Sequence, residues 1–201
     1  MSVTIAGAIP TIGRPSLERT LGAIVSQGLI DGDEVFVVQA THVGAREGVA
    51  ARVDAFGPHM RYLEYDHGMS FKGVFQSNLA FHRATADYVL AHSDDDVFTA
   101  GAFDRLRALA APDTQRPILF RTISPKGNPT WPDGQPQLRR NKLGGGSLAA
   151  PRAYLKDFHY PCDGIDYYWV CEIMALAAAA GHLPIWTDEI LMRSRNRERR
   201  T

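Results

Sequence analysis

The sequence has little cysteine and no long apolar run. Its two cysteines, Cys162 and Cys171, are nine positions apart, a spacing that indicates neither a zinc site nor a disulfide framework. The seven histidines contain no pair at metal-binding spacing. No charged-then-apolar leader opens the chain, and no apolar run approaches the roughly 20 residues of a membrane-spanning helix. We therefore expect a protein of a reducing compartment, the cytoplasm, without a transmembrane segment.

The sequence also has no formal net charge. Lysine and arginine total 22, and aspartate and glutamate also total 22, so overall charge does not favour a polyanionic partner. The exception is "RSRNRERR" near the end of the chain, which carries five arginines. It is open to two interpretations, a solvated terminus or a contact with a phosphate backbone. The 201 residues suit one globular domain, which we place at residues 1–192, followed by a basic tail at residues 193–201.

Strand and helix signals alternate along the chain. Apolar and β-branched runs predict strands at residues 3–9, 34–38, 61–65, 88–92 and 117–123, and near 184–186 and 189–193. Apolar residues at helical spacing predict helices beginning near residue 15, over 71–85, around 103–109 and over 164–180. This order is typical of a three-layer α/β/α domain with a mostly parallel sheet. A long polar loop, roughly residues 124–146, interrupts the alternation of strands and helices. Loops of this length are usually functional or disordered.

Three consecutive aspartates, Asp94, Asp95 and Asp96, follow the strand predicted at residues 88–92. Ligands of open α/β sheets bind beyond the carboxyl ends of strands, so the cluster occupies a favourable place for a site. Two carboxylates about 4 Å apart repel by about 1 kcal/mol in water and by several times more near a protein. A cation relieves that repulsion, and oxygen ligands select Mg²⁺ or Mn²⁺ with substrate phosphates completing the shell. The alternative is a surface turn in which Asp96 caps the next helix.

A fourth aspartate begins the inward stripe of the helix predicted at residues 164–180. Asp166, Trp169, Ile173 and Leu176 recur at spacings of three and four and therefore share one face. A carboxylate in the first turn of a helix is kept ionised by the helix dipole and can act as a general base. A capping arrangement with Asp163 is the structural alternative.

Several motifs resemble the inverting family-2 glycosyltransferases of the GT-A fold over nearly the whole chain. They are "PTIGR" after the first strand, "SNLAFHRATADYVLAHSDDD" before and within the acidic motif, "GGGSLAAPRAYL", and "GIDYYWVCEIMALAAAAG". The resemblance implies a metal-dependent, inverting hexosyl- or pentosyltransferase. Such an enzyme moves a sugar from a nucleoside-diphosphate sugar to a hydroxyl acceptor and uses Mn²⁺ or Mg²⁺.

The resemblance also implies roles for individual residues. Thr11 and Arg14 would line the nucleotide pocket, Asp94 would contact the nucleotide sugar, and Asp95 would bind the metal. Asp166 would be the base that deprotonates the acceptor. Ser93 stands where many members begin the acidic motif, so the roles of Asp95 and Asp96 as metal ligands are open to exchange.

Other candidate residues surround this core set. Gln39 stands where the family usually has an acidic residue that recognises the base or ribose. Lys72 and Arg193 are candidates for the diphosphate, and Asn78 is a candidate for holding the pocket loop. On the acceptor side we place Trp131, which we expect to be exposed in its loop, with Gly145 and Gly146. His92 is predicted to be an interior residue.

The acceptor and the reaction leave alternatives open. A glycan or a small molecule is the favoured acceptor, and a nucleic acid with a hydroxylated base is the alternative that the arginine-rich end suggests. A GT-A-like nucleotidyltransferase is a rival activity. It would need a loop rich in glycine and in lysine or arginine after the first strand to bind a triphosphate, whereas "PTIGRPS" has one glycine and one arginine. A non-catalytic nucleotide- or sugar-binding domain is a rival of another class.

Overall fold

A computed structural model of the chain describes residues 2–41, 46–66, 73–131, 145–156, 158 and 166–194. Its strands are β1 (Ile5–Thr11), β2 (Glu34–Ala40), β3 (Met60–Tyr65), β4 (Tyr88–Ala91), β5 (Asp96–Phe98), β6 (Ile118–Ile123), β7 (Leu148–Pro151) and β8 (Ile185–Ser194). Its helices are α1 (Ser16–Val25), α2 (Val49–Asp54), α3 (Val74–Arg83), α4 (Ala102–Ala110) and α5 (Asp166–Ala179), with short 3-10 turns at Gly145–Ser147 and Arg152–Tyr154.

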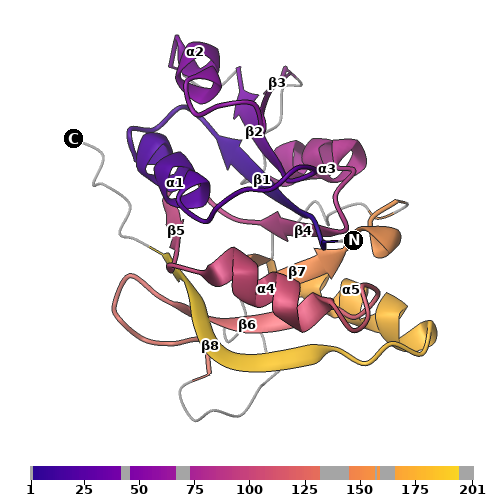
Figure 1. Cartoon of the computed structure of the whole chain (residues 1–201). Coiled ribbons are helices and arrows are strands. Elements are labelled where there is room, and N and C mark those ends of the chain that lie inside the picture. Colours follow the sequence, from indigo (N-terminus) through magenta and orange to yellow (C-terminus); the bar gives the residue numbers. More distant parts are fainter. Residues whose placement is uncertain are drawn as a thin grey trace.

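The strands form one sheet in the order β3-β2-β1-β4-β7-β6-β8-β5. β1, β2, β3 and β4 run parallel to one another, as do β6 and β8. β7 is antiparallel to both of its neighbours, and β5 is antiparallel to β8. The expectation of a mostly parallel α/β sheet is confirmed, with the antiparallel pairs gathered in the part of the sheet from β4 to β5 in strand order (Figure 1).

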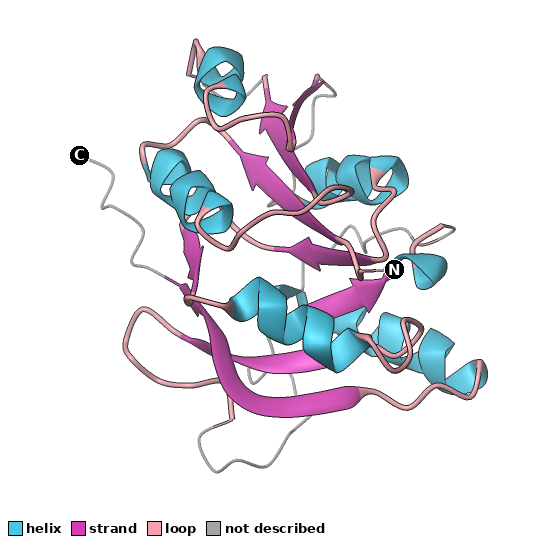
Figure 2. Ribbon diagram, in the orientation of Figure 1, coloured by secondary structure: helices cyan, strands magenta, loops and turns pink. Residues whose placement is uncertain are grey.

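Two separate hydrophobic cores show that helices cover both faces of the sheet (Figure 2). Along β1, Ile5 and Ile9 point into one core, whereas Ala6 and Ala8 point into the other, as the two-residue period of a strand requires. The first core also contains buried residues of α1, α2 and α4, and the second contains those of α3 and α5. The three-layer α/β/α prediction is therefore confirmed.

The central strand β1 marks a change in the direction of strand order. The chain passes from β1 to β2 on one side, and β4 later joins the other side of β1. In open sheets such a switch point leaves a crevice beyond the carboxyl ends of the two strands. Thr11, at the end of β1, and the aspartates after β4 flank this point.

Three local predictions need correction. β1 does not close before Pro10 but continues to Thr11. Pro10 is tolerated because β4 has already ended opposite Ala8, so that among the described strands Pro10 is paired with β2 alone. Asp96 is not a helix cap, since it begins β5 and Gly101 is the N-cap of α4. The two final strands predicted near residues 184–193 are one continuous strand, β8.

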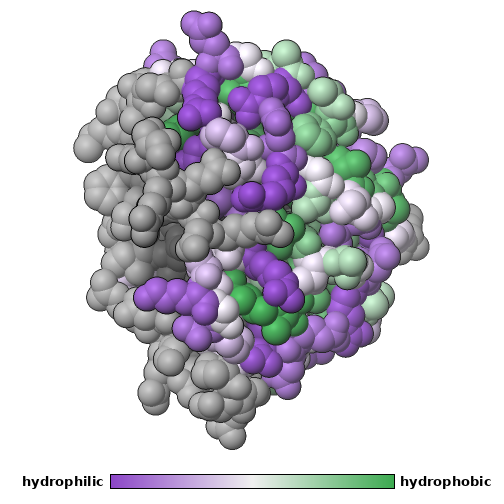
Figure 3. Space-filling model, turned by 90° about the vertical axis from the view of Figure 1, so that its left-hand side faces the viewer, coloured by the Kyte–Doolittle hydropathy of each residue, from purple (hydrophilic) through white to green (hydrophobic). Residues whose placement is uncertain are grey.

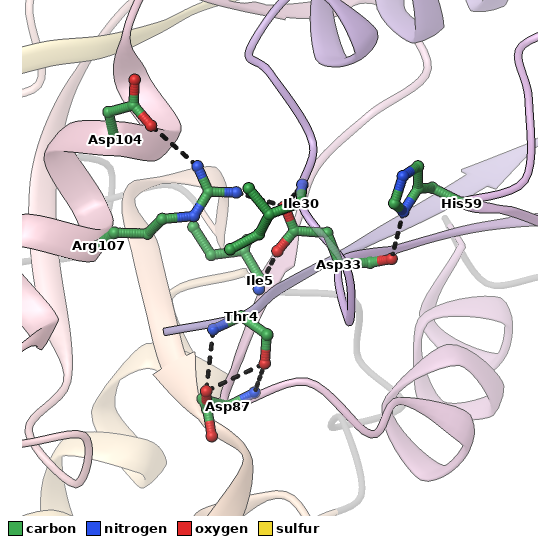
Figure 4. Close-up of polar contacts among 8 residues, drawn as sticks. All are labelled: Thr4, Ile5, Ile30, Asp33, His59, Asp87, Asp104 and Arg107. Carbon is green, nitrogen blue, oxygen red and sulfur yellow. Dashed lines mark hydrogen bonds and ion pairs between the residues drawn. The ribbon is translucent and has the colours of Figure 1, made fainter. Parts of the chain in front are cut away.

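A buried ion pair ties the opposite, N-terminal end of the sheet together (Figure 4). Asp33 accepts hydrogen bonds from the backbone N–H groups of Ile5 at 2.8 Å and Ile30 at 2.9 Å and pairs with Arg107 of α4. Arg107 also reaches Asp104 at 3.0 Å. This network joins the start of β1 to α4 and lies away from the acidic turn, so we assign it to stability.

None of the helices in the described ranges combines the length and the apolar character needed to cross a membrane. On the face shown in Figure 3, hydrophilic and hydrophobic residues of the described part are interspersed. Residues 195–201 of the predicted basic tail lie outside the described residues. The cytoplasmic location stays a prediction.

Candidate functional site

Asp94 is held from two sides at the switch point. It is 2% exposed, and its Oδ2 accepts a 2.6 Å hydrogen bond from Thr11 Oγ1. Its Oδ1 pairs with a guanidinium nitrogen of Arg14 at 3.0 Å. The Thr11 hydroxyl in turn accepts a 2.9 Å hydrogen bond from the backbone N–H of Gly13. The structure thus brings together Thr11, Arg14 and Asp94, three residues predicted for the nucleotide pocket.

The electrostatics of this group are set by burial. Burial raises the pKa of the Asp94 carboxyl above its usual value. The hydrogen bond from Thr11 and the charge of Arg14 lower this pKa, and the neighbouring Asp95 raises it. Desolvation is the largest of these effects, so Asp94 depends on its two partners for its charged form. The Arg14 side chain is 40% exposed and reaches from the buried carboxylate to the surface, where its other N–H groups can meet an anion.

The other two aspartates differ in what holds them. The Oδ2 of Asp96 accepts a 2.9 Å hydrogen bond from the backbone N–H of Ser93, which closes the turn. Asp95 is 8% exposed and accepts no side-chain hydrogen bond from any residue in the described ranges. Of the two candidate metal ligands, Asp95 is therefore the one whose oxygens are open to a ligand within the described part of the chain.

The sequence did not reveal Thr20, a residue of α1 that contacts the acidic turn. Its Oγ1 lies 3.0 Å from the carbonyl oxygen of Asp94 and 2.9 Å from that of Asp96. The only signal was a polar side chain between Leu17, Leu21 and Ile24 in the apolar stripe of this helix. Such a position is usually apolar, so a hydroxyl there indicates a buried hydrogen bond.

Gln39 lies opposite Thr11 as the next-to-last residue of β2, but both the oxygen and the nitrogen of its buried amide are already bonded. Its Oε1 accepts a 2.6 Å hydrogen bond from the Tyr62 hydroxyl, and its Nε2 donates to the carbonyl of Arg46 at 2.9 Å. Burial, followed by the neighbouring Glu64, raises the pKa of Tyr62 to about 12. Tyr62 therefore stays a neutral donor, and the side chain of Gln39 supports the pocket wall. Recognition of the base by Gln39 stays a prediction.

The candidates for the diphosphate and the pocket loop lie in different places. Arg193 is exposed on β8, opposite Val97 of β5, and the next residue, Ser194, is opposite Asp96. Arg193 therefore borders the acidic turn. Asn78 is half-buried on α3, which covers the opposite face of the sheet from α1. Lys72 lies outside the described residues.

The acceptor-side residues are described only in part. Trp131 is buried in the second core and packs edge-on against Trp186 with ring centres 5.7 Å apart, so our expectation that it is exposed was wrong. Gly146 lies so close to Met192 that a Cβ would sit 2.4 Å from its Cε. Gly145 begins the 3-10 turn that contacts β4, β6 and α5.

The predicted base, Asp166, is the first residue of α5, and its side chain lies outside the described part. α5 packs against the 3-10 turn at Gly145–Ser147, and this turn contacts β4. The backbone thus links the helix that carries Asp166 to the strand that carries the acidic turn.

A groove of about 510 Å³ lies elsewhere, along the edge strand β3 between α2 and α3. Two of its four charged side chains, Glu34 and Arg61, bond to the backbone of the fold. Glu34 accepts hydrogen bonds from the backbone N–H groups of Thr85 at 2.7 Å and Ala86 at 3.2 Å, and Arg61 donates to the carbonyl of Pro58 at 2.6 Å. We therefore place the candidate site at the acidic turn and not in this groove.

The acidic turn fits a cation that a substrate helps to hold. Within the described residues no group of three or more His, Cys, Asp or Glu side chains could enclose a metal alone. Mg²⁺ usually takes one or two protein carboxylates and completes its shell with phosphates and water. Asp95, with Asp96 beside it, supplies that number of carboxylates.

Comparison with solved structures shows the fold. A fragment of TarS from S. aureus in complex with UDP has a TM-score of 0.73 at 14% identity, over 96% of this chain. The complex of the same fragment with UDP-GlcNAc has a TM-score of 0.72 at 16% identity, over 100% of this chain. The mannosyltransferase PcManGT from Pyrobaculum calidifontis, in complex with GDP-Man and Mn²⁺, has a TM-score of 0.65 at 18% identity, over 98% of this chain. The chain therefore has the GT-A fold of these glycosyltransferases.

The match covers only part of these structures. The chain spans 61% and 60% of the two TarS fragment structures and 58% of the mannosyltransferase. Comparison with models of known protein families and with curated proteins gave no match. The comparisons therefore bear on the fold, and the activity rests on the residues of the site.

Proposed function

We propose that the protein is a metal-dependent inverting glycosyltransferase that takes its sugar from a nucleoside-diphosphate donor. The observation that carries this proposal is the acidic turn at the switch between β1 and β4. There Asp94 is bonded to Thr11 and Arg14, while Asp95 has no hydrogen bond in the described part of the chain. The GT-A fold supports the proposal, because structures with this fold hold UDP, UDP-GlcNAc, or GDP-Man with Mn²⁺.

Each residue of the turn has a role in this proposal. Asp94 orients Thr11 and Arg14, and Arg14 presents its remaining N–H groups to the diphosphate. Asp95, assisted by Asp96, would hold Mn²⁺ or Mg²⁺ against the same diphosphate. When bound, the cation neutralises charge that develops on the leaving phosphate.

The acceptor is activated from the other side of the sugar. Asp166 would accept the proton of the acceptor hydroxyl as general base. Displacement from the side opposite the leaving diphosphate inverts the anomeric centre. We propose a glycan or a small molecule as the acceptor, with a nucleic acid as the alternative.

Donor hydrolysis tests the activity without knowledge of the acceptor. UDP-GlcNAc and GDP-mannose are incubated with Mn²⁺, and release of free sugar is measured for the wild type, Asp95→Ala and Asp166→Asn. We expect cation-dependent release by the wild type and none by Asp95→Ala. Asp166→Asn is expected to keep donor binding and to lose turnover. A wild type that binds nucleotide but releases no sugar from a panel of donors with any divalent cation contradicts the enzyme and favours a binding domain. Release of pyrophosphate from a nucleoside triphosphate indicates a nucleotidyltransferase.

A further inference from the structure

Thr20 touches the acidic turn at two points, and these points flank Asp95. Its side chain is 0% exposed. Its Oγ1 lies 3.0 Å from the Asp94 carbonyl oxygen and 2.9 Å from the Asp96 carbonyl oxygen. A threonine hydroxyl has one proton, so the two carbonyls share it. The backbone immediately before and after Asp95 is thus tied to α1 by a single side chain.

The position of the Asp95 carboxylate depends on that backbone. No residue of the described chain bonds this carboxylate, so its direction follows from the turn that carries it. On one side the turn is fixed by β5, where Asp96 is paired with Ser194 of β8. On the other side Thr20 holds it from a buried helix. A β-branched side chain in a helix is stiff at χ1, which makes this anchor rigid.

We propose that Thr20 is a positioning residue for the divalent cation. By holding the carbonyls of Asp94 and Asp96, it fixes the direction in which Asp95 presents its oxygens. This inference rests on the proposed function, in which Asp95 binds the cation. Loss of a group that orients a metal ligand typically lowers metal affinity by about 10- to 100-fold. Mg²⁺ is sensitive to such a change because it requires near-ideal octahedral geometry.

Two substitutions separate the hydroxyl from the shape of the side chain. Thr20→Val keeps the shape and removes the hydroxyl, whereas Thr20→Ser keeps the hydroxyl. Mn²⁺ affinity is measured from the electron paramagnetic resonance signal of free Mn²⁺, with saturating UDP and then with saturating GDP. We expect Thr20→Val to weaken Mn²⁺ binding by about 10-fold or more and Thr20→Ser to stay near the wild type. Thr20→Ala supplies a second variant without the hydroxyl if Thr20→Val fails to fold.

Ile24→Val is the matched control for lost stability, since Ile24 lies in the same buried stripe of α1 and its aliphatic side chain cannot hydrogen-bond the turn. Melting temperatures of all variants are measured alongside Mn²⁺ affinity. The proposal is overturned if a variant without the hydroxyl binds Mn²⁺ as the wild type does. It is also overturned if Ile24→Val weakens binding equally. A wild type that binds no Mn²⁺ with either nucleotide contradicts the proposed function itself, and this outcome is visible before any variant is compared.

Discussion

His92 lies directly before the acidic turn, and its ring is buried. Its Nδ1 is 3.3 Å from the carbonyl oxygen of Ser93, and the ring packs edge-on against Phe98. Its Nε2 has no hydrogen-bond partner within the described ranges, and it faces Gly7, where a Cβ would be 3.4 Å away. Burial lowers the pKa of His92 from 6.5 to about 4. The prediction of an interior histidine is confirmed, and the fold holds it in its neutral form.

This histidine predicts a loss of stability in acid. Because the folded pKa lies below the unfolded pKa, the unfolded chain binds the proton first as pH falls. The stability that comes from keeping His92 neutral is fully present above about pH 6.5 and is lost as pH falls toward 4. It amounts to roughly 3 kcal/mol of unfolding free energy. Urea unfolding between pH 7 and pH 4 should therefore show a steeper loss for the wild type than for His92→Gln. The exposed His82→Gln is the control, and equal slopes for wild type and His92→Gln would refute this account.

Sequence reasoning found the residues of the site that stand in motifs and missed those that act through distant contacts. Thr11 and Arg14 were predictable because "PTIGR" resembles a glycosyltransferase motif, and Asp94 because "SDDD" follows a predicted strand. Thr20 was not predictable, because its partners lie 74 and 76 positions away. The burial of Trp131 was missed for the same reason, since its partner Trp186 belongs to β8.

At the scale of elements, the turn between β1 and α1 depends on Gly13. Its φ is +83°, and a Cβ there would lie 2.7 Å from Val49 Cγ2 and 3.1 Å from Arg46 Cβ. Gly28 has a similar φ of +70° but nothing within 4 Å of a Cβ. We expect Gly28→Ala to lose about 1 kcal/mol or somewhat more through backbone strain. Gly13→Ala should lose more, because it adds a clash to the same strain. Chemical denaturation measures the unfolding free energy of both variants. Equal losses for Gly13→Ala and Gly28→Ala would show that the turn can relax away from α2.

The ion pair between α4 and the segment before β2 allows a similar comparison. Removing one partner of a buried pair costs about 3–5 kcal/mol, and Asp33 and Arg107 are both buried. Arg105, two positions away on α4, pairs with Glu189, and both of these side chains are exposed. An exposed pair contributes about 0–1 kcal/mol. Arg107→Met should therefore lower the unfolding free energy far more than Arg105→Met. Similar losses for the two variants would mean that water reaches the pair.

The elements missed by the sequence are short, namely the helix α2 and the strands β5 and β7. Within the described part of the chain, the three residues of β5 pair with β8, and the four residues of β7 lie between β4 and β6. Neither has enough residues to show a two-residue period. The longer elements were predictable because each carries its own pattern, as α5 does up to its stop at Gly181, whose φ is +83°.

At the scale of the whole molecule, the alternation of strands and helices was sufficient to predict the α/β class. Which strands become neighbours was not predictable from that alternation alone, since the position of β5 beside β8 depends on contacts about 100 residues apart. The result is a GT-A fold in which one helix, α1, and two strands, β1 and β4, meet at a single acidic turn. Which donor base, sugar and acceptor are selected depends on side chains other than those of the acidic turn.

The central claim is that Asp95 carries a divalent cation which holds a nucleoside diphosphate. Calorimetric titration of UDP and of GDP, with Mn²⁺ and then with a chelator, tests it most directly. The account predicts binding of at least one nucleotide that requires Mn²⁺, is lost in Asp95→Asn, and persists in Asp31→Asn, which removes an exposed carboxylate. Binding that is equally tight with the chelator, or that Asp95→Asn leaves intact, would contradict the claim.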